Sequence, residues 1–247
     1  MRYVSQISEI INAFSPEPLN GKEQMEKFYC DKTMEYRMND KYSSPMEDIL
    51  DLCQEEGAHS AFLLLGHKGC GKSTELNRLS AELVSKGYRV KTITCSTDLD
   101  MFNIVYTDLF ILMGEALLSI AEECGCKIKR DILEGIMDFW DEAMEISLSK
   151  EEESVSVETG IGVETPGVFA CILKVFAKIK ADLKYNEEVR REYRKKIRAR
   201  SSEWMELLRR VSDEIISTMK GKAPVIIFED LDKLNPDDAW EVFYHYA

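Results

Sequence analysis

One nine-residue stretch constrains this chain more than any other, the segment Gly66–Thr74. It reads Gly-His-Lys-Gly-Cys-Gly-Lys-Ser-Thr and matches the spacing G-x-x-x-x-G-K-S. The apolar run 61–65 before it is predicted to be a strand, and a helix-like segment, 75–83, follows it. Glycines at this spacing let successive backbone N–H groups turn toward the same phosphate oxygens. The positive N-terminal end of the following helix faces the same anion. The spacing therefore predicts a phosphate-binding loop (P-loop).

Each side chain at the end of this loop has an expected role. We expect Lys72 to reach the β- and γ-phosphates and to act in catalysis, and the Ser73 hydroxyl to coordinate Mg²⁺. The predicted cofactors are therefore ATP and Mg²⁺. The predicted nucleotide contacts are Gly66, His67, Lys68, Gly69, Cys70, Gly71, Lys72, Ser73 and Thr74.

A second stretch near the end of the chain complements the loop. The continuous apolar run 224–228 is typical of a strand buried on both faces, and it ends in Glu229, Asp230 and Asp232. Sheets of α/β proteins place ligands at such strand ends. One acid would hold Mg²⁺ and another would orient or deprotonate the attacking water. Glu229, Asp230 and Asp232 are the candidates for these metal-binding and catalytic roles.

Composition limits the remaining function classes. At 247 residues and 45% hydrophobic content, the chain is large enough for one substantial core with a small appendage. The formal charge of -13 argues against a surface that follows nucleic acid throughout. Seven cysteines without a C-x-x-C pair indicate reduced thiols in the cytoplasm and no zinc site. No apolar run approaches the roughly 18 residues of a membrane span.

The remaining elements follow from periodicity. Apolar residues at helical spacing predict helices over 4–14, 21–30, 46–53, 101–123, 130–148, 186–219 and 235–247. β-branched alternation predicts a strand over 89–95. Alternation on both sides of a Thr-Pro-Gly turn predicts a β-hairpin over 150–185. Its second arm also fits a helix, because Val168, Ile172, Phe176, Ile179 and Leu183 have helical spacing.

The segment 174–200 is strongly basic. It has eleven Lys and Arg residues against four acids, so its net charge is +7 and the rest of the chain carries -20. One interpretation is a solvated helix with ion pairs such as Glu187–Arg191 and Glu192–Lys196. The other is a surface for an anionic partner, either nucleic acid or an acidic face of another subunit.

Together, Gly66–Thr74 and Val225–Lys233 resemble the motifs of the additional-strand (ASCE) P-loop ATPases, in particular the AAA+, STAND and KAP-like groups. The resemblance implies an α/β three-layer sandwich with a mainly parallel sheet. The N-terminal helical segment would be 1–44 and the ATPase core 45–247, with a β-hairpin and long-helix insertion over about 150–220. It also implies that Tyr42–Met46, just before the P-loop strand, contacts the base.

The resemblance assigns roles to the acids by position. Glu229 lies where the family has its metal aspartate, Asp230 where AAA+ proteins have the catalytic acid, and Asp232 where STAND proteins often have theirs. Because residue 229 is a glutamate, which acid holds the metal stays open. The family's next strand, sensor residue, lid and arginine finger have no counterpart, since the sequence ends fifteen residues after Asp232. We therefore expect a core that is incomplete at its C-terminus, with its own turnover left open.

The expected function is Mg²⁺-dependent ATP hydrolysis coupled to conformational change or assembly, with ATP or ADP and another copy or protein as partners. The alternatives are a nucleotide-gated interaction switch with negligible turnover and a small-molecule kinase. A GTPase would need an N-K-x-D motif to read its base, and the sequence contains none. Sequence alone does not separate an ATPase from a switch.

Overall fold

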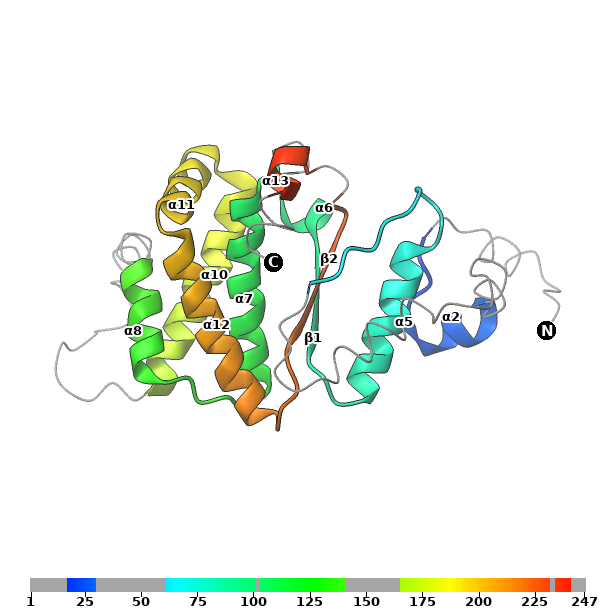
Figure 1. The fold of residues 1–247 in the computed structure, drawn as a ribbon, viewed down its shortest axis with the longest axis horizontal. Coiled ribbons are helices and arrows are strands. Elements are labelled where there is room, and N and C mark those ends of the chain that lie inside the picture. The colour runs from blue at the N-terminus through cyan, green and yellow to red at the C-terminus, as the bar shows by residue number, and fades with distance from the viewer. Residues whose placement is uncertain (1–16, 30–60, 101–102, 141–164, 232–233, 241–247) are drawn as a thin grey trace. The chain divides into compact units, whose positions relative to one another are not determined.

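The structure is a computed structural model, and it describes residues 17–29, 61–100, 103–140, 165–231 and 234–240 (Figure 1). The chain divides into two compact units, Met1–Val90 and Lys91–Ala247. Expected elements that fall elsewhere lie outside the described residues: the helices over 4–14 and 46–53, the base-contacting Tyr42–Met46, and the first arm of the hairpin. No helix in the described ranges is long and apolar enough to span a membrane.

The first unit contains helices α2 (Gly21–Phe28) and α5 (Lys72–Ser85), which confirms both predicted helices there. Helix α5 buries Leu79 and Leu83, whereas α2 has no buried residue. The strand predicted over 61–65 is wrong, because this run forms neither helix nor strand. A strand is stabilised by a neighbour that shares its hydrogen bonds. The run has none among the described residues, and it leaves Leu65 78% exposed.

The second unit contains the sheet. Strands β1 (Val90–Thr94, whose first residue closes the first unit) and β2 (Val225–Glu229) pair in parallel, which confirms both predicted strands. The predicted three-layer sandwich is wrong, because the described chain is mostly helical and its sheet has two strands. Two segments that were expected to be strands are not strands. Residues 61–65 form neither helix nor strand, and residues 168–185 are helical.

The helices of the second unit pack around α7 (Tyr106–Glu123), as Figure 1 shows in green. A helix that is apolar on nearly all sides is typically buried, and most residues of α7 are buried. It contacts three of its neighbours directly, α10, α11 and α12. The neighbouring helices are α8 (Arg130–Phe139), α10 (Thr165–Tyr185), α11 (Glu187–Ala199) and α12 (Ser201–Thr218).

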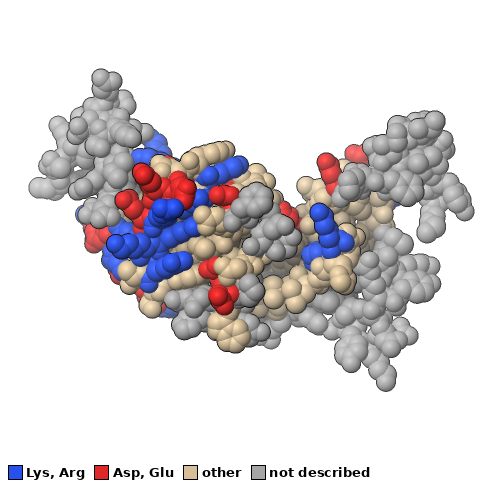
Figure 2. Space-filling model, turned by 90° about the horizontal axis from the view of Figure 1, so that it is seen from above, with Lys and Arg blue, Asp and Glu red and all other residues tan. Residues whose placement is uncertain are grey.

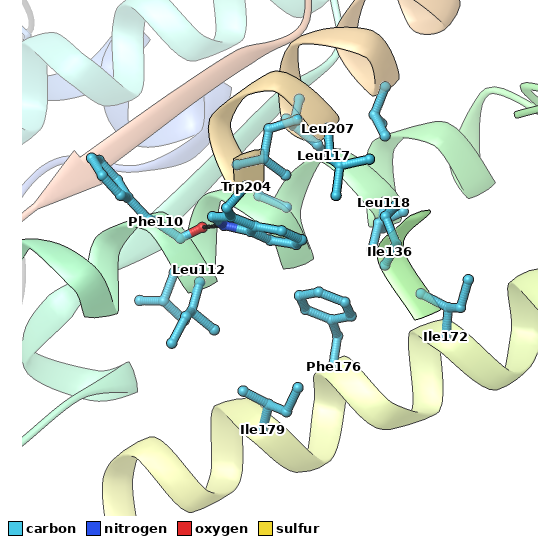
Figure 3. Close-up of a cluster of buried hydrophobic side chains, with 14 of the residues drawn as sticks. Phe110, Leu112, Leu117, Leu118, Ile136, Ile172, Phe176, Ile179, Trp204 and Leu207 are labelled. Atoms are coloured by element: carbon cyan, nitrogen blue, oxygen red, sulfur yellow. Dashed lines mark hydrogen bonds between the residues drawn. The ribbon is translucent and has the colours of Figure 1, made fainter. Parts of the chain in front are cut away.

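Aromatic side chains fill the centre of this helical core (Figure 3). Trp204 of α12 is fully buried and stacks on Phe176 of α10, with ring centroids 5.8 Å apart. Its indole Nε1 donates to the backbone oxygen of Phe110 at 3.0 Å, so the polar end of the ring is satisfied inside the core. Phe139 and Trp140 pack against the same indole. The core therefore joins α7, α10 and α12 through one side chain.

The predicted second arm of the hairpin is α10, so the strand interpretation of 168–185 is wrong. Ile172, Val175, Phe176, Ile179 and Leu183 are all buried, and their spacing of three and four places them on one helical face. An alternating strand would have placed Phe176 and Ile179 on opposite faces. Burial against α7 therefore favours the helix.

The single helix predicted over 186–219 is two helices. It breaks at Arg200, whose φ of -132° and ψ of 34° are not helical. The guanidinium of Arg200 lies 4.7 Å from the centre of the Phe139 ring and pairs with Glu203. The break allows α12 to turn its Trp204 face into the core while α11 follows a different direction (Figure 1).

Two short helices flank the sheet. Helix α6 (Cys95–Asp98) directly follows β1, and α13 (Pro236–Trp240) follows β2. In α13 the buried Asp238 accepts the Tyr106 amide at 3.3 Å, so it caps the start of α7. The helix predicted over 101–123 begins later than expected, at Tyr106. Asp108 accepts the Val105 amide at this helix start. Of the helix predicted over 130–148, the structure describes α8 (Arg130–Phe139), and the part from residue 141 onward lies outside the described residues.

Candidate functional site

The P-loop has a turned backbone that leads directly into α5. Gly71 is the N-cap of α5 at φ 91°, and Gly69 has φ 81°, both in the left-handed region that glycine adopts without strain. The Cys70 amide donates to the His67 oxygen at 3.2 Å and closes the turn. The loop is therefore a tight turn that leads directly into the N-terminus of α5, the positive end of that helix.

Lys72 bends back over this loop. Its Nζ donates to the backbone oxygens of Gly66 at 2.8 Å and His67 at 3.0 Å. Both acceptors are exposed carbonyls rather than carboxylates, so the ammonium charge is not neutralised by a partner acid in these two contacts. A phosphate entering the loop would offer this cation a stronger, charge-assisted acceptor. The predicted contact of Lys72 with phosphate stays a prediction.

The two hydroxyl residues that follow Lys72 have different surroundings. Thr74 accepts the Leu19 amide through its Oγ1 at 3.2 Å, and Asn77 donates to the Leu19 oxygen at 2.9 Å. Tyr29 donates to Glu75 at 2.9 Å, so α2 is held to α5 on both its sides. Thr74 was predicted to contact nucleotide, and its hydroxyl instead binds the segment before α2. Ser73 stays the predicted Mg²⁺ ligand.

The acids after β2 belong to the second unit. Asp230 is exposed and has a φ of 61°, an uncommon conformation for a residue other than glycine. Its carboxylate accepts a hydrogen bond from the Ser96 hydroxyl, which α6 presents at the end of the neighbouring strand β1. The two strand ends therefore meet, as expected for parallel strands. Asp232 lies outside the described residues, and Glu229 is the last residue of β2.

The structure places the two predicted half-sites in different units. Lys72 and Ser73 are in the first unit, and Glu229 and Asp230 are in the second. Within the described ranges, no three His, Cys, Asp or Glu side chains form a group that could hold a metal ion. The geometry of the P-loop and the geometry of the acids after β2 are therefore each given within their own unit.

The basic segment 174–200 is largely neutralised within its own unit. Arg190 and Arg194 are buried and pair with Asp100 and Asp108. The predicted pair Glu187–Arg191 is confirmed, since these side chains form an i,i+4 ion pair. Figure 2 shows Lys and Arg side chains gathered on one face of this unit, with acids among them. Internal pairing therefore accounts for a substantial part of the +7 charge.

Three of the acidic partners lie in the segment 96–108, which runs from α6 into the first turn of α7 and which the sequence did not single out. Asp98 pairs with Lys180 at 3.3 Å, and the Thr97 oxygen accepts from Lys184 at 2.6 Å. Its charge pattern, with acids at 98, 100 and 108, is complementary to the basic segment. This charge complementarity was the signal in the sequence that could have revealed these ion pairs.

Cys95 lies directly before this segment and is fully buried. Burial, the largest cause, and the nearby charges of Asp230, Asp98 and Asp108 together raise the pKa of its thiol to about 12. The thiol is therefore protonated and unreactive at neutral pH.

Comparison with known proteins adds no relative: no family model, no curated protein and no solved structure matches this chain. The family resemblance therefore rests on the two motifs.

Proposed function

We propose that this chain binds Mg-ATP through the loop Gly66–Thr74 and hydrolyses it with the help of the acids after β2. The observation that carries the proposal is the position of the Lys72 ammonium over a loop that leads into a helix N-terminus. A chain of amides, a positive helix end and a cation at one place is suited to the β- and γ-phosphates. Coupling of hydrolysis to conformational change or assembly, in the cytoplasm, is part of the same proposal.

The residues present fit the nucleotide and its metal. A Cβ added at Gly66 would lie 2.7 Å from Cys70 Sγ, so a larger residue there would displace the Cys70 side chain within the loop. Mg²⁺, when bound, would neutralise phosphate charge and link the nucleotide to Ser73 and to an acid. Lys72 would stabilise the charge that develops on the transferred phosphoryl group. Asp230 would orient or deprotonate the attacking water.

A nucleotide-gated switch is the second candidate, and the contacts between α2 and α5 favour it. Leu19 and Tyr29 bind Thr74, Asn77 and Glu75 within the first two turns of the helix that follows the loop. A change at the phosphates would reach these residues through one rigid helix. Such coupling needs no turnover, so a switch and an ATPase share this part of the proposal.

Isothermal titration with Mg-ATP tests the binding step. Lys72→Ala should weaken binding by about 1.5–3 kcal/mol, the range for a hydrogen bond to a charged group. Lys86→Ala is the matched control, because Lys86 follows the last turn of the same helix and pairs with Glu82 in a surface ion pair. Equal ATP affinities for the two variants would reject the nucleotide proposal.

Phosphate release tests the hydrolysis step. Asp230→Asn should keep ATP affinity and slow hydrolysis by on the order of a hundredfold, because the lost charge is needed in the transition state. If Asp232→Asn has this effect and Asp230→Asn does not, Asp232 is the catalytic acid. Tight ATP binding with no release by the unmodified chain would select the switch.

A further inference from the structure

Helix α6 is too short to be stable alone. It has four residues, Cys95–Asp98, and no side chain caps its first turn. Helix nucleation is unfavourable, so a single turn depends on tertiary contacts. Helix α6 contacts β2 on one side and α10 on another.

Two lysines of α10 provide the polar part of this support. Lys180 pairs with Asp98 at 3.3 Å and Lys184 donates to the Thr97 oxygen at 2.6 Å. They are four residues apart on α10, so both lie on the face that meets α6. Asp98 is only 22% exposed as a side chain, so its pair is partly shielded from water. The last carbonyls of a helix are favourable sites for cations.

The opposite side of α6 presents Ser96 to Asp230. The Ser96 hydroxyl donates to one carboxylate oxygen of Asp230, which is otherwise exposed and in an uncommon backbone conformation. The position of α6 therefore sets the direction of this carboxylate.

We infer that Lys180 and Lys184 are positioning residues for Asp230, acting through α6 and Ser96. The consequence for hydrolysis rests on the proposed function. The hold on α6, by which we mean the contacts of Lys180 and Lys184 with this helix, rests on geometry alone. Helix α10, which carries both lysines, would then control the acid at the end of β2. A partner or conformational change that competes for the two lysines would release α6 and lower turnover without touching the nucleotide.

The hold on α6 can be measured without any nucleotide. Cys95 is buried in α6, so its alkylation by iodoacetamide, followed by mass spectrometry of its peptide, reports opening of this helix. The double variant Lys180→Ala/Lys184→Ala should be labelled at Cys95 about tenfold faster, because two polar contacts of the closed state are lost. Labelling of the half-buried Cys124, at the far end of α7, should stay unchanged.

Hydrolysis kinetics test the positioning role. In the double variant kcat should fall about tenfold while KM for ATP stays constant, as expected when geometry at the acid is loosened. Lys180→Arg/Lys184→Arg keeps both cations and should restore the kcat and the slow labelling. Lys174→Ala is the control, since it removes an exposed lysine from the same helix.

The outcomes separate the two proposals. Unchanged Cys95 labelling in the double Ala variant overturns this inference, whatever the hydrolysis rate. Faster labelling with unchanged kcat overturns the positioning role. Faster labelling in a chain that neither binds nor hydrolyses ATP supports the hold on α6 and rejects the proposed function.

Discussion

The guanidinium of Arg194 donates to both carboxylate oxygens of Asp108, with Nε 2.8 Å from Oδ1, and the two residues are buried where α11 meets the start of α7. Asn103 accepts from the same guanidinium at 3.1 Å, and Asp108 also accepts the Val105 amide. Burial raises the pKa of the Asp108 carboxyl, while the hydrogen bond and charge of Arg194 oppose that rise.

Removing one partner of this pair should be costly. Asp108→Asn keeps the shape of the side chain but leaves the Arg194 charge buried without its counter-ion, so the free energy of unfolding should fall by about 3–5 kcal/mol. Urea denaturation at neutral pH measures the loss. Asp213→Asn is the control, because its pair with Arg209 is exposed and should contribute about 0–1 kcal/mol. Similar losses in both variants would mean that the pair at Asp108 is not buried in solution.

Gly114 of α7 makes a second prediction about the core. A Cβ at this position would lie 2.5 Å from Cζ2 of Trp204, and both groups are confined by Phe176. Gly114→Ala gains helix propensity but should still destabilise the protein, by about 1–3 kcal/mol, because overpacking displaces the indole. Thermal unfolding followed by near-UV circular dichroism measures the change.

A double variant checks the cause of that loss. Trp204→Phe removes the ring atoms that a Cβ at Gly114 would strike, at the cost of the hydrogen bond to Phe110. Gly114→Ala should therefore cost less in the Trp204→Phe background than in the unmodified chain. Additive losses would show that the contact with Trp204 is not what limits residue 114.

Cys95 predicts how stability depends on alkaline pH. Its pKa is raised from 9.0 to about 12, chiefly by burial, so the unfolded chain loses this proton at lower pH than the folded chain does. The thiol's contribution to stability is therefore fully present below pH 9 and is lost as pH rises toward 12. Cys95→Ala should lower stability at pH 7 and flatten its decline between pH 9 and 11 in urea titrations. An unchanged slope in this variant would show that the thiol is not the titrating group.

Local patterns predicted the elements whose backbone conformation is determined by a few neighbouring residues. The P-loop turn and α5 follow from Gly69, Gly71 and Lys72, and β1 and β2 follow from short apolar runs bounded by turn residues. These features depend on backbone geometry that a few residues determine. The family resemblance, in contrast, supplied the three-layer sandwich, which the structure contradicts.

Tertiary burial decided what periodicity left open. Residues 168–185 fit both a strand and a helix, and only the core around Trp204 shows which face is buried. Local patterns also did not identify the ion-pair partners of the basic segment, because Arg194 and Asp108 are 86 residues apart. Ser96 was missed for the same reason, since its contact with Asp230 depends on the pairing of β1 with β2.

Ser73 and Thr74 provide the sharpest comparison at the P-loop, because two adjacent hydroxyls have different expected roles. The Thr74 hydroxyl accepts the Leu19 amide, so Thr74→Val should release the segment before α2 and cost about 0.5–1.5 kcal/mol of stability. Its effect on the Mg²⁺ dependence of ATP binding should be small.

Ser73→Ala should behave in the opposite way. It removes the hydroxyl predicted to coordinate Mg²⁺, so ATP affinity should lose its dependence on Mg²⁺ while the melting temperature of the free chain stays unchanged. Titrations of ATP with and without Mg²⁺, paired with trypsin cleavage at Lys22 and Lys27 of the exposed α2, measure both effects on each variant. Faster cleavage in Thr74→Val alone, and loss of the Mg²⁺ effect in Ser73→Ala alone, are the expected results. If Thr74→Val abolishes the Mg²⁺ effect instead, the threonine hydroxyl leaves Leu19 for the metal when nucleotide binds.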